Sequence, residues 1–171
     1  MIIPIKLYGY WRIQEEKEEI PDIPDIPGVY CVYENIYNHL NDNVDIKRLL
    51  YIGGSSHIRG NIKIHLAYDN WLDRLDPKHE LCFSVGYVHP EDYQRAENAL
   101  IFEHRPSFNN KEDIVYPYSD TTISLSGDTC LLQKRFVVCQ MDAEQAELDS
   151  MIEKGTYPHE QEMMSYADRR G

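Results

Sequence analysis

The chain of 171 residues has few basic residues, no long apolar run and no closely spaced cysteines. Its four cysteines are far apart and form no C-x-x-C pair (Cys31, Cys82, Cys130 and Cys139). This spacing argues against a disulfide framework and a zinc site, so we expect reduced thiols in a cytoplasmic protein. No apolar run is long enough to span a bilayer. The first ten residues carry a single Lys and no long apolar core, which is not the pattern of a signal peptide.

Positive charge is scarce, since 17 Lys and Arg residues stand against 29 Asp and Glu residues, for a net charge of −12. A surface that binds DNA usually has a basic balance, so the overall charge argues against nucleic acid as a partner. The excess is uneven, however. Residues 26–110 hold 8 basic and 11 acidic residues, whereas residues 142–171 hold 3 and 8. The middle of the chain therefore leaves room for a local positive face, and the tail is acidic.

Apolar residues make up 42% of the chain, which is enough for a globular domain with a buried core. We divide the chain into an N-terminal extension (1–25), a central domain (26–110), a β extension packed on it (111–141) and an acidic helical or loose tail (142–171). Three prolines spaced by three residues over 20–28 predict a stiff, extended approach to the domain.

The central domain alternates short β-rich and longer helical segments. Residues 28–33 and 49–53 predict two strands that pair as an antiparallel hairpin, joined by a long polar connection over 34–47. A helix is expected from Ser56 or His57 to about Trp71, a strand over 81–88, and a helix ending at Arg105, before Pro106. We therefore expect an α+β fold, a small mixed or antiparallel sheet in β-β-α-β-α order flanked by helices. Residues 116–126 and 133–138 predict a C-terminal β-hairpin, and 142–154 an acidic helix.

The last helix of the central domain carries a charge where an apolar residue is expected. Its apolar stripe recurs at three- and four-residue steps (Tyr93, Ala96, Leu100, Ile101 and His104). Glu97 lies on that stripe, and a carboxylate there is costly unless it is paired. The structural interpretation is a Glu at the edge of the stripe that pairs with Arg95 or Arg105. We favour instead a carboxylate kept for a functional role.

Three segments together resemble one family. Gly28-Val29-Tyr30 and Tyr51-Ile52-Gly53 resemble the paired strand motifs that name the GIY-YIG nuclease superfamily. The helix after the second motif ends its apolar stripe at His65, as many members do. Glu97-x-x-Leu100-Ile101, followed by Pro106-x-x-Asn109, is similar to the region with the family's metal-binding Glu and a later structural Asn. The resemblance covers about residues 26–110, roughly half the chain.

The resemblance implies hydrolysis of DNA phosphodiester bonds with one divalent ion, Mg²⁺ or Mn²⁺. Glu97 would hold the ion, because hard cations prefer carboxylate and water oxygens. Tyr30 would activate the attacking water with Tyr51 beside it, and His65 would share the proton traffic. A free tyrosine has a pKa of about 10, so it needs a nearby cation to act as a base near neutral pH. Gly28, Gly53 and Asn109 would be structural motif residues.

One position departs from the family pattern. The family usually places a catalytic Arg eight residues after the glycine of the second motif and four before the His, and here this position is Asn61. Asn61 brings hydrogen bonds but no charge, so it would not lower the pKa of a tyrosine as an Arg would. Arg59 is a candidate substitute, although two residues along a regular helix place it on roughly the opposite side.

Plain structural interpretations stand beside these roles. Tyr30 and Tyr51 also suit any strand, His65 suits a satisfied core position, and Asn109 suits a turn. The leading hypothesis is a metal-dependent DNA endonuclease impaired by Asn61. The alternative is a catalytically inactive binding or regulatory module that keeps the fold. A third hypothesis is that the acidic tail covers or mimics DNA, in which case cutting the chain near residue 141 should raise its affinity for DNA.

Overall fold

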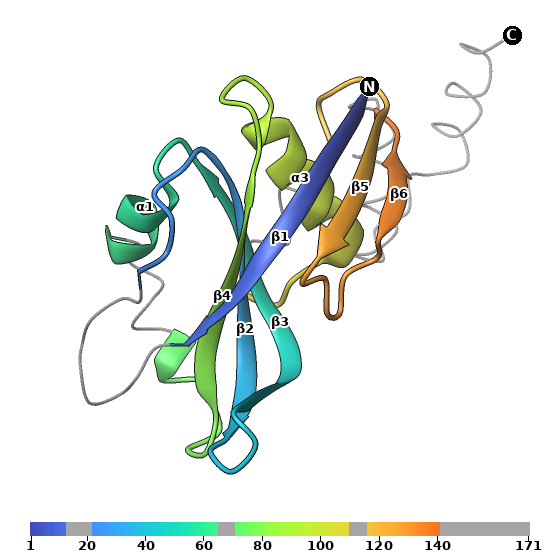
Figure 1. Ribbon diagram of the computed structural model, residues 1–171. Helices are drawn as coiled ribbons and strands as arrows, with labels where there is room; N and C mark the ends of the chain where they lie inside the picture. The colour runs from blue at the N-terminus through green and yellow to red at the C-terminus, as the bar shows by residue number, and fades with distance from the viewer. Residues whose placement is uncertain (13–21, 65–70, 110–115, 141–171) are drawn as a thin grey trace, which may run out of the picture.

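The computed structural model describes residues 1–12, 22–64, 71–109 and 116–140. Six strands form one curled sheet, and helices pack against it (Figure 1). The strands are β1 (Ile2–Arg12), β2 (Gly28–Asn38), β3 (Asn43–Ser55), β4 (Glu80–Tyr87), β5 (Thr121–Gly127) and β6 (Arg135–Val138). The helices are α1 (Ile58–Ile64) and α3 (Tyr93–His104). None of the described helices has the length and apolar character that crossing a membrane requires.

The sheet is mixed, in the order β3-β2-β4-β1-β5-β6. β2 pairs antiparallel with β3 and β4, β1 pairs antiparallel with β4 and parallel with β5, and β5 pairs antiparallel with β6. The α+β class with a mixed sheet is confirmed, as is the antiparallel pairing of the two motif strands. The sequence does not predict β1, although its buried Ile3, Ile5 and Leu7 alternate with exposed residues as a half-buried strand should.

Two expectations around the first hairpin are wrong. The polar stretch 34–47 is not a long connection, because β2 runs to Asn38 and β3 starts at Asn43. The ladder continues there because Val44 and Ile46 pack against the core and cross-strand pairs such as Glu34 with Arg48 add to the backbone hydrogen bonds. In addition, the second strand does not end at Gly53, because β3 runs on to Ser55. Gly53 and Gly54 are strand residues of β3, paired with Tyr30 and Val29.

The helices agree with expectation where they are described. α3 ends at His104, and Arg105 adopts a left-handed conformation before Pro106 (φ 46°), with its N–H donating to Ile101 O. α1 covers only the first part of the helix expected to reach Trp71, since residues 65–70 lie outside the described ranges. The acidic helix expected over 142–154 also lies outside them.

Two apolar clusters occupy the two faces of the sheet. α3 covers one face, where Ala96, Ala99 and Leu100 pack against β1, β2 and β5. The other face is covered by α1 and Trp71 over β2, β3 and β4. α3 lies behind β1 and β5 in Figure 1, and α1 lies at the left of the sheet. The candidate site forms near the β3 edge, where residues from both layers meet.

Candidate active site

Four elements bring the predicted side chains together around the two glycines at the end of β3. β2 supplies Tyr30, β3 supplies Tyr51, α1 supplies Asn61 and α3 supplies Glu97. The hydroxyl of Tyr30 donates to Oδ1 of Asn61 at 2.9 Å. It also shares a hydrogen bond with the Tyr51 hydroxyl, and the charge of Glu97 acts on both tyrosines.

The glycines of the second motif provide the space for this cluster. A Cβ added at Gly53 would lie 2.4 Å from Cζ and 2.5 Å from the hydroxyl oxygen of Tyr30. A Cβ added at Gly54 would lie 2.8 Å from Oε2 of Glu97. Any side chain at these two positions would therefore displace one of the site's polar groups. The sequence analysis names Gly53 but assigns no such role to Gly54, because the contact with Glu97 depends on how α3 packs on the sheet.

Glu97 has no cation to neutralise it among the described residues. Burial raises the pKa of its carboxyl to about 7, and the hydrogen bond from the Gly54 backbone opposes the shift only in part. Pairing with Arg95 or Arg105, the structural interpretation, does not occur. The Arg95 guanidinium lies over the Tyr118 ring, and the Arg105 guanidinium donates to Phe102 O. A partly buried carboxylate without a counterion is costly, so the fold retains a group that destabilises it.

The two tyrosines are held as neutral phenols. Burial raises the pKa of Tyr30 far above its ordinary value, and the Tyr51 hydroxyl and the Glu97 charge add to the shift. Burial likewise raises the pKa of Tyr51, with a further contribution from Glu97. Tyr51 also packs on Trp71, with ring centroids 5.1 Å apart. Neither phenol is a base near neutral pH in this environment.

The candidate substitute for the missing Arg does not reach the cluster. Arg59 forms an ion pair with Asp22 at 2.7 Å and donates to Ile23 O, so its guanidinium is engaged with the segment before β2. This follows from its position on α1, two residues from Asn61. His65, the other predicted participant, lies outside the described residues.

The two remaining motif residues hold the backbone. Gly28 has φ +151°, and a Cβ there would lie 2.0 Å from Gly86 O, so only glycine permits the close pairing of β2 with β4. Asn109 receives the Ile52 N–H on Oδ1 (2.9 Å) and donates from Nδ2 to Ile52 O (2.8 Å). Its amide therefore acts as one more strand residue beside β3, and Phe108 N–H extends this pairing by donating to Leu50 O at 2.9 Å.

The donor set fits one class of metal ion. No group of three His, Cys, Asp or Glu side chains gathers among the described residues, so a closed zinc-type site is not built from them. A single buried carboxylate beside hydroxyl groups suits Mg²⁺ or Mn²⁺, because such ions bind through one or two carboxylates and fill their shell with water and phosphate oxygens. Glu97 is the residue that would hold the ion.

Comparisons of the chain with protein-family models, with curated proteins and with solved structures found no match.

Proposed function

We propose that the chain is a metal-dependent phosphodiester hydrolase, a DNA endonuclease of the GIY-YIG type, whose activity is reduced by Asn61 at the family's Arg position. The observation that supports it is the partly buried Glu97 carboxylate, whose charge acts on two tyrosine hydroxyls and which has no cationic partner among the described residues. Further support comes from the succession of β2, β3, α1, β4 and α3 along the chain.

Hydrolysis needs a positive charge next to the phosphate oxygens, and a divalent ion on Glu97 supplies that charge when it is bound. The water oxygen forms a bond to phosphorus as one ester P–O bond breaks; the water gives up a proton and the leaving oxygen gains one. Tyr30 keeps its proton, because its hydroxyl donates a hydrogen bond to Asn61 Oδ1 and no described cation stabilises the phenolate. Its role here is to position water or phosphate. Proton removal from water is the weak step, so we expect slow cutting.

A second candidate function is a catalytically inactive module that binds or regulates. The Tyr30–Asn61 hydrogen bond favours it, because this neutral pair satisfies both groups without a cation or a reacting water. The same hydrogen bond weakens Tyr30 as a general base, so a nuclease assay has to distinguish the two functions.

Nicking of supercoiled plasmid DNA with Mg²⁺ or Mn²⁺ tests the proposal. Wild-type protein is compared with Glu97→Gln, with Asn61→Arg and with the control Glu103→Gln, which removes a carboxylate from the same helix. We expect slow, chelator-sensitive nicking that is lost in Glu97→Gln, kept in Glu103→Gln and faster in Asn61→Arg. If wild type and Asn61→Arg are both inert across supercoiled, branched and single-stranded DNA, the inactive module replaces the enzyme.

A further inference from the structure

The face of the sheet that carries Tyr30 is covered over only half its width. α1 and Trp71 pack on β2, β3 and β4. On β1, β5 and β6, alternate side chains of the same face remain partly or fully exposed. Figure 1 shows β1 crossing the front of the sheet with α3 behind it. We call this uncovered half the open face. It consists of Ile2, Pro4, Lys6, Tyr8, Thr122, Ser124, Ser126, Arg135 and Val137, bordered by Tyr87 of β4.

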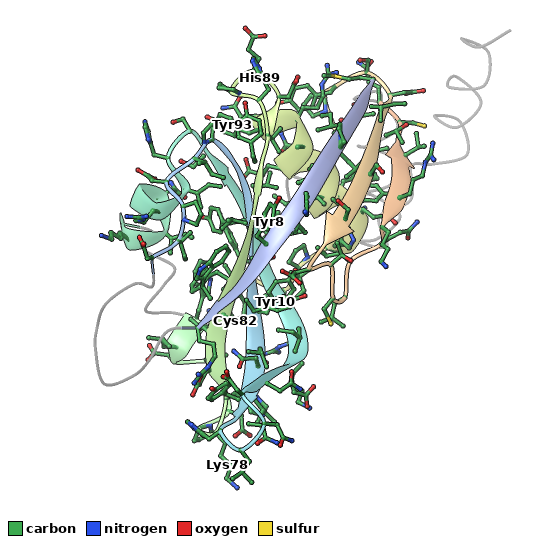
Figure 2. The ribbon with its side chains drawn as sticks, viewed as in Figure 1. Tyr8, Tyr10, Lys78, Cys82, His89 and Tyr93 are labelled. Atoms are coloured by element: carbon green, nitrogen blue, oxygen red, sulfur yellow. The ribbon has the colours of Figure 1, made fainter. Side chains whose placement is uncertain are left out.

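Two aromatic rings stand out from the open face. Tyr8 is 50% exposed and Tyr87 is 54% exposed, on the neighbouring antiparallel strands β1 and β4. Lys6 lies between them in register, because the pair Leu7–Gly86 places Lys6 opposite Tyr87. Its ammonium nitrogen is 5.0 Å from the centroid of the Tyr8 ring. Figure 2 shows Tyr8 on the front of β1. Exposed rings on adjacent strands, with a cation between them, form a stacking platform for unpaired bases.

The charge of the open face differs from that of the chain. The chain has a net charge of −12. The strand positions of the open face hold two cations, Lys6 and Arg135, and no Asp or Glu. Neither cation has an ion-pair partner within the described ranges. Among small polar residues (Thr122, Ser124 and Ser126), these cations complement phosphate.

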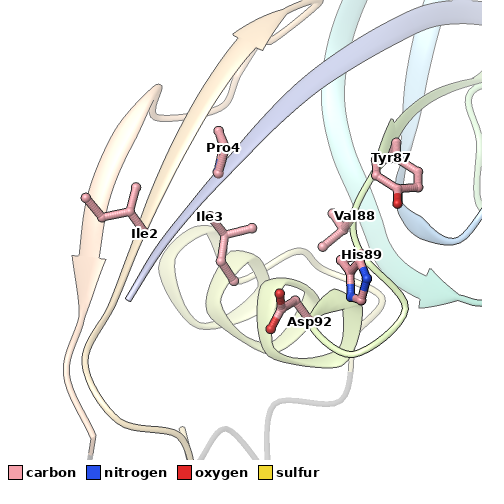
Figure 3. A pocket seen from close by; sticks show the side chains of 7 residues that line it. All are labelled: Ile2, Ile3, Pro4, Tyr87, Val88, His89 and Asp92. Carbon is pink, nitrogen blue, oxygen red and sulfur yellow. The ribbon is translucent and has the colours of Figure 1, made fainter.

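A hollow of about 210 Å³ opens at the end of the face where Tyr87 lies. Ile2, Pro4 and Tyr87 form walls, and His89 and Asp92 add polar groups (Figure 3). The Asp92 carboxylate in this lining can accept hydrogen bonds from the exocyclic amino group of a base, and it repels phosphate. The hollow therefore suits the base of a nucleotide whose phosphates lie toward Lys6.

We propose that the open face binds single-stranded nucleic acid, with one base stacked on Tyr8, a second on Tyr87 at the mouth of the hollow, and phosphates beside Lys6 and Arg135. Bases in a duplex are stacked on one another and cannot lie flat on these rings, which is why the strand must be single. The inference rests on the proposed function for its choice of nucleic acid as ligand, but binding to the open face needs neither Glu97 nor a metal ion.

Fluorescence anisotropy with labelled single-stranded DNA and RNA, in the presence of a chelator, measures this binding directly. Tyr8→Ala and Tyr87→Ala should each weaken binding about tenfold, since stacking on an aromatic side chain is worth about 1–3 kcal/mol per base. Lys6→Ala should weaken binding at low salt and reduce the salt slope by about one. The control Lys78→Ala removes an exposed lysine at the far end of the sheet (Figure 2). It should change neither the affinity nor its dependence on salt. Circular dichroism of each variant confirms that it is folded.

Three results would overturn the inference: no binding by wild type, equal losses in Lys78→Ala, or a duplex competing better than a single strand. Size-exclusion chromatography tests whether a second copy of the chain binds the open face instead. If the wild type is a dimer that Tyr8→Ala dissociates, and neither protein binds nucleic acid, the open face is a contact between two copies. The plasmid assay separates the two proposals. Metal-dependent nicking without single-strand binding refutes only the open face, whereas chelator-resistant binding without nicking refutes only the enzyme.

Discussion

Two partly or fully buried carboxylates lie against β3, Glu34 from β2 and Glu97 from α3, and their pKa values are shifted in opposite directions. Glu34 is 6% exposed and lies 2.7 Å from His79 Nδ1, while Arg48 donates to it at 2.9 Å. Burial alone would raise the pKa of Glu34, but the His79 hydrogen bond and the Arg48 charge outweigh it, so its pKa is lowered. Glu97 accepts a hydrogen bond from the Gly54 backbone N–H but pairs with no cation among the described residues, and burial raises its pKa.

The difference separates a structural carboxylate from a candidate functional one. Glu34 ties the long β2–β3 arm to the turn before β4, and its partners come from the chain itself. Glu97 lowers the stability of the folded chain unless a cation comes from outside. A strongly perturbed carboxyl in a polar cluster is a candidate functional group for this reason.

The largest expected effect separates the two carboxylates by activity. Glu97→Gln should reduce metal-dependent nicking at least about 100-fold. It removes the anionic ligand, and without that ligand the positive charge of the ion is lost from beside the phosphate. Glu34→Gln should leave the rate per folded molecule nearly unchanged. The measurement is the initial nicking rate, corrected for the folded fraction by circular dichroism. Comparable losses in both variants would remove the distinction drawn here.

The glycines that make room for the site give the next effect. Gly53→Ala should destabilise the fold by about 1–3 kcal/mol, because its Cβ would overlap the Tyr30 ring. Gly60 in α1 is the matched control, since an added Cβ there meets nothing closer than 3.8 Å. Gly60→Ala should stabilise the protein by up to about 1 kcal/mol through helix propensity. Urea unfolding measures both, and equal effects would mean that Tyr30 is not confined by Gly53.

Stability without metal should move in opposite directions in the two Glu-to-Gln variants. Glu97→Gln should stabilise the protein at pH 8 by about 1–2 kcal/mol, because it removes a buried charge that lacks a counterion. Glu34→Gln should destabilise it by about 1 kcal/mol, since the half-exposed Arg48 is screened by solvent. Chemical denaturation in a chelating buffer tests the signs. Destabilisation by Glu97→Gln would mean that the carboxylate is satisfied within the fold.

The pH dependence sharpens the same contrast. The folded-state pKa of Glu97 is about 7 and its ordinary value is 4.5, so the folded protein binds more protons between these values. Glu97 therefore lowers wild-type stability progressively as pH rises through that window, by about 1 kcal/mol or more at its upper end. The lowered pKa of Glu34 acts oppositely, contributing stability above the ordinary value that is lost as pH falls. The free energy of unfolding of wild type and of each variant is measured from pH 4 to 8, and the differences between them isolate these two contributions.

The sequence predicts the parts of the molecule whose signals are local. Hydrophobic alternation and the Arg105-Pro106 boundary give β4 and α3 closely, and motif spacing selects Tyr30, Tyr51, Asn61 and Glu97, which the structure brings together. It does not predict β1, whose partner β5 is more than a hundred residues away and whose parallel pairing no local pattern encodes. The sequence likewise cannot show that Arg95 and Arg105 turn away from Glu97, because the conformations of long side chains depend on the tertiary packing around them.

The central claim is that Glu97 holds a divalent ion that the chain's own cations do not replace. Amide NMR spectra with substoichiometric Mn²⁺ test it directly, because the paramagnetic ion broadens signals only near its binding site. The account predicts strong broadening at Gly53 and Gly54 in wild type and in Glu103→Gln, and none there in Glu97→Gln. Broadening confined to other acidic parts of the chain, or unchanged at Gly54 in Glu97→Gln, would contradict it.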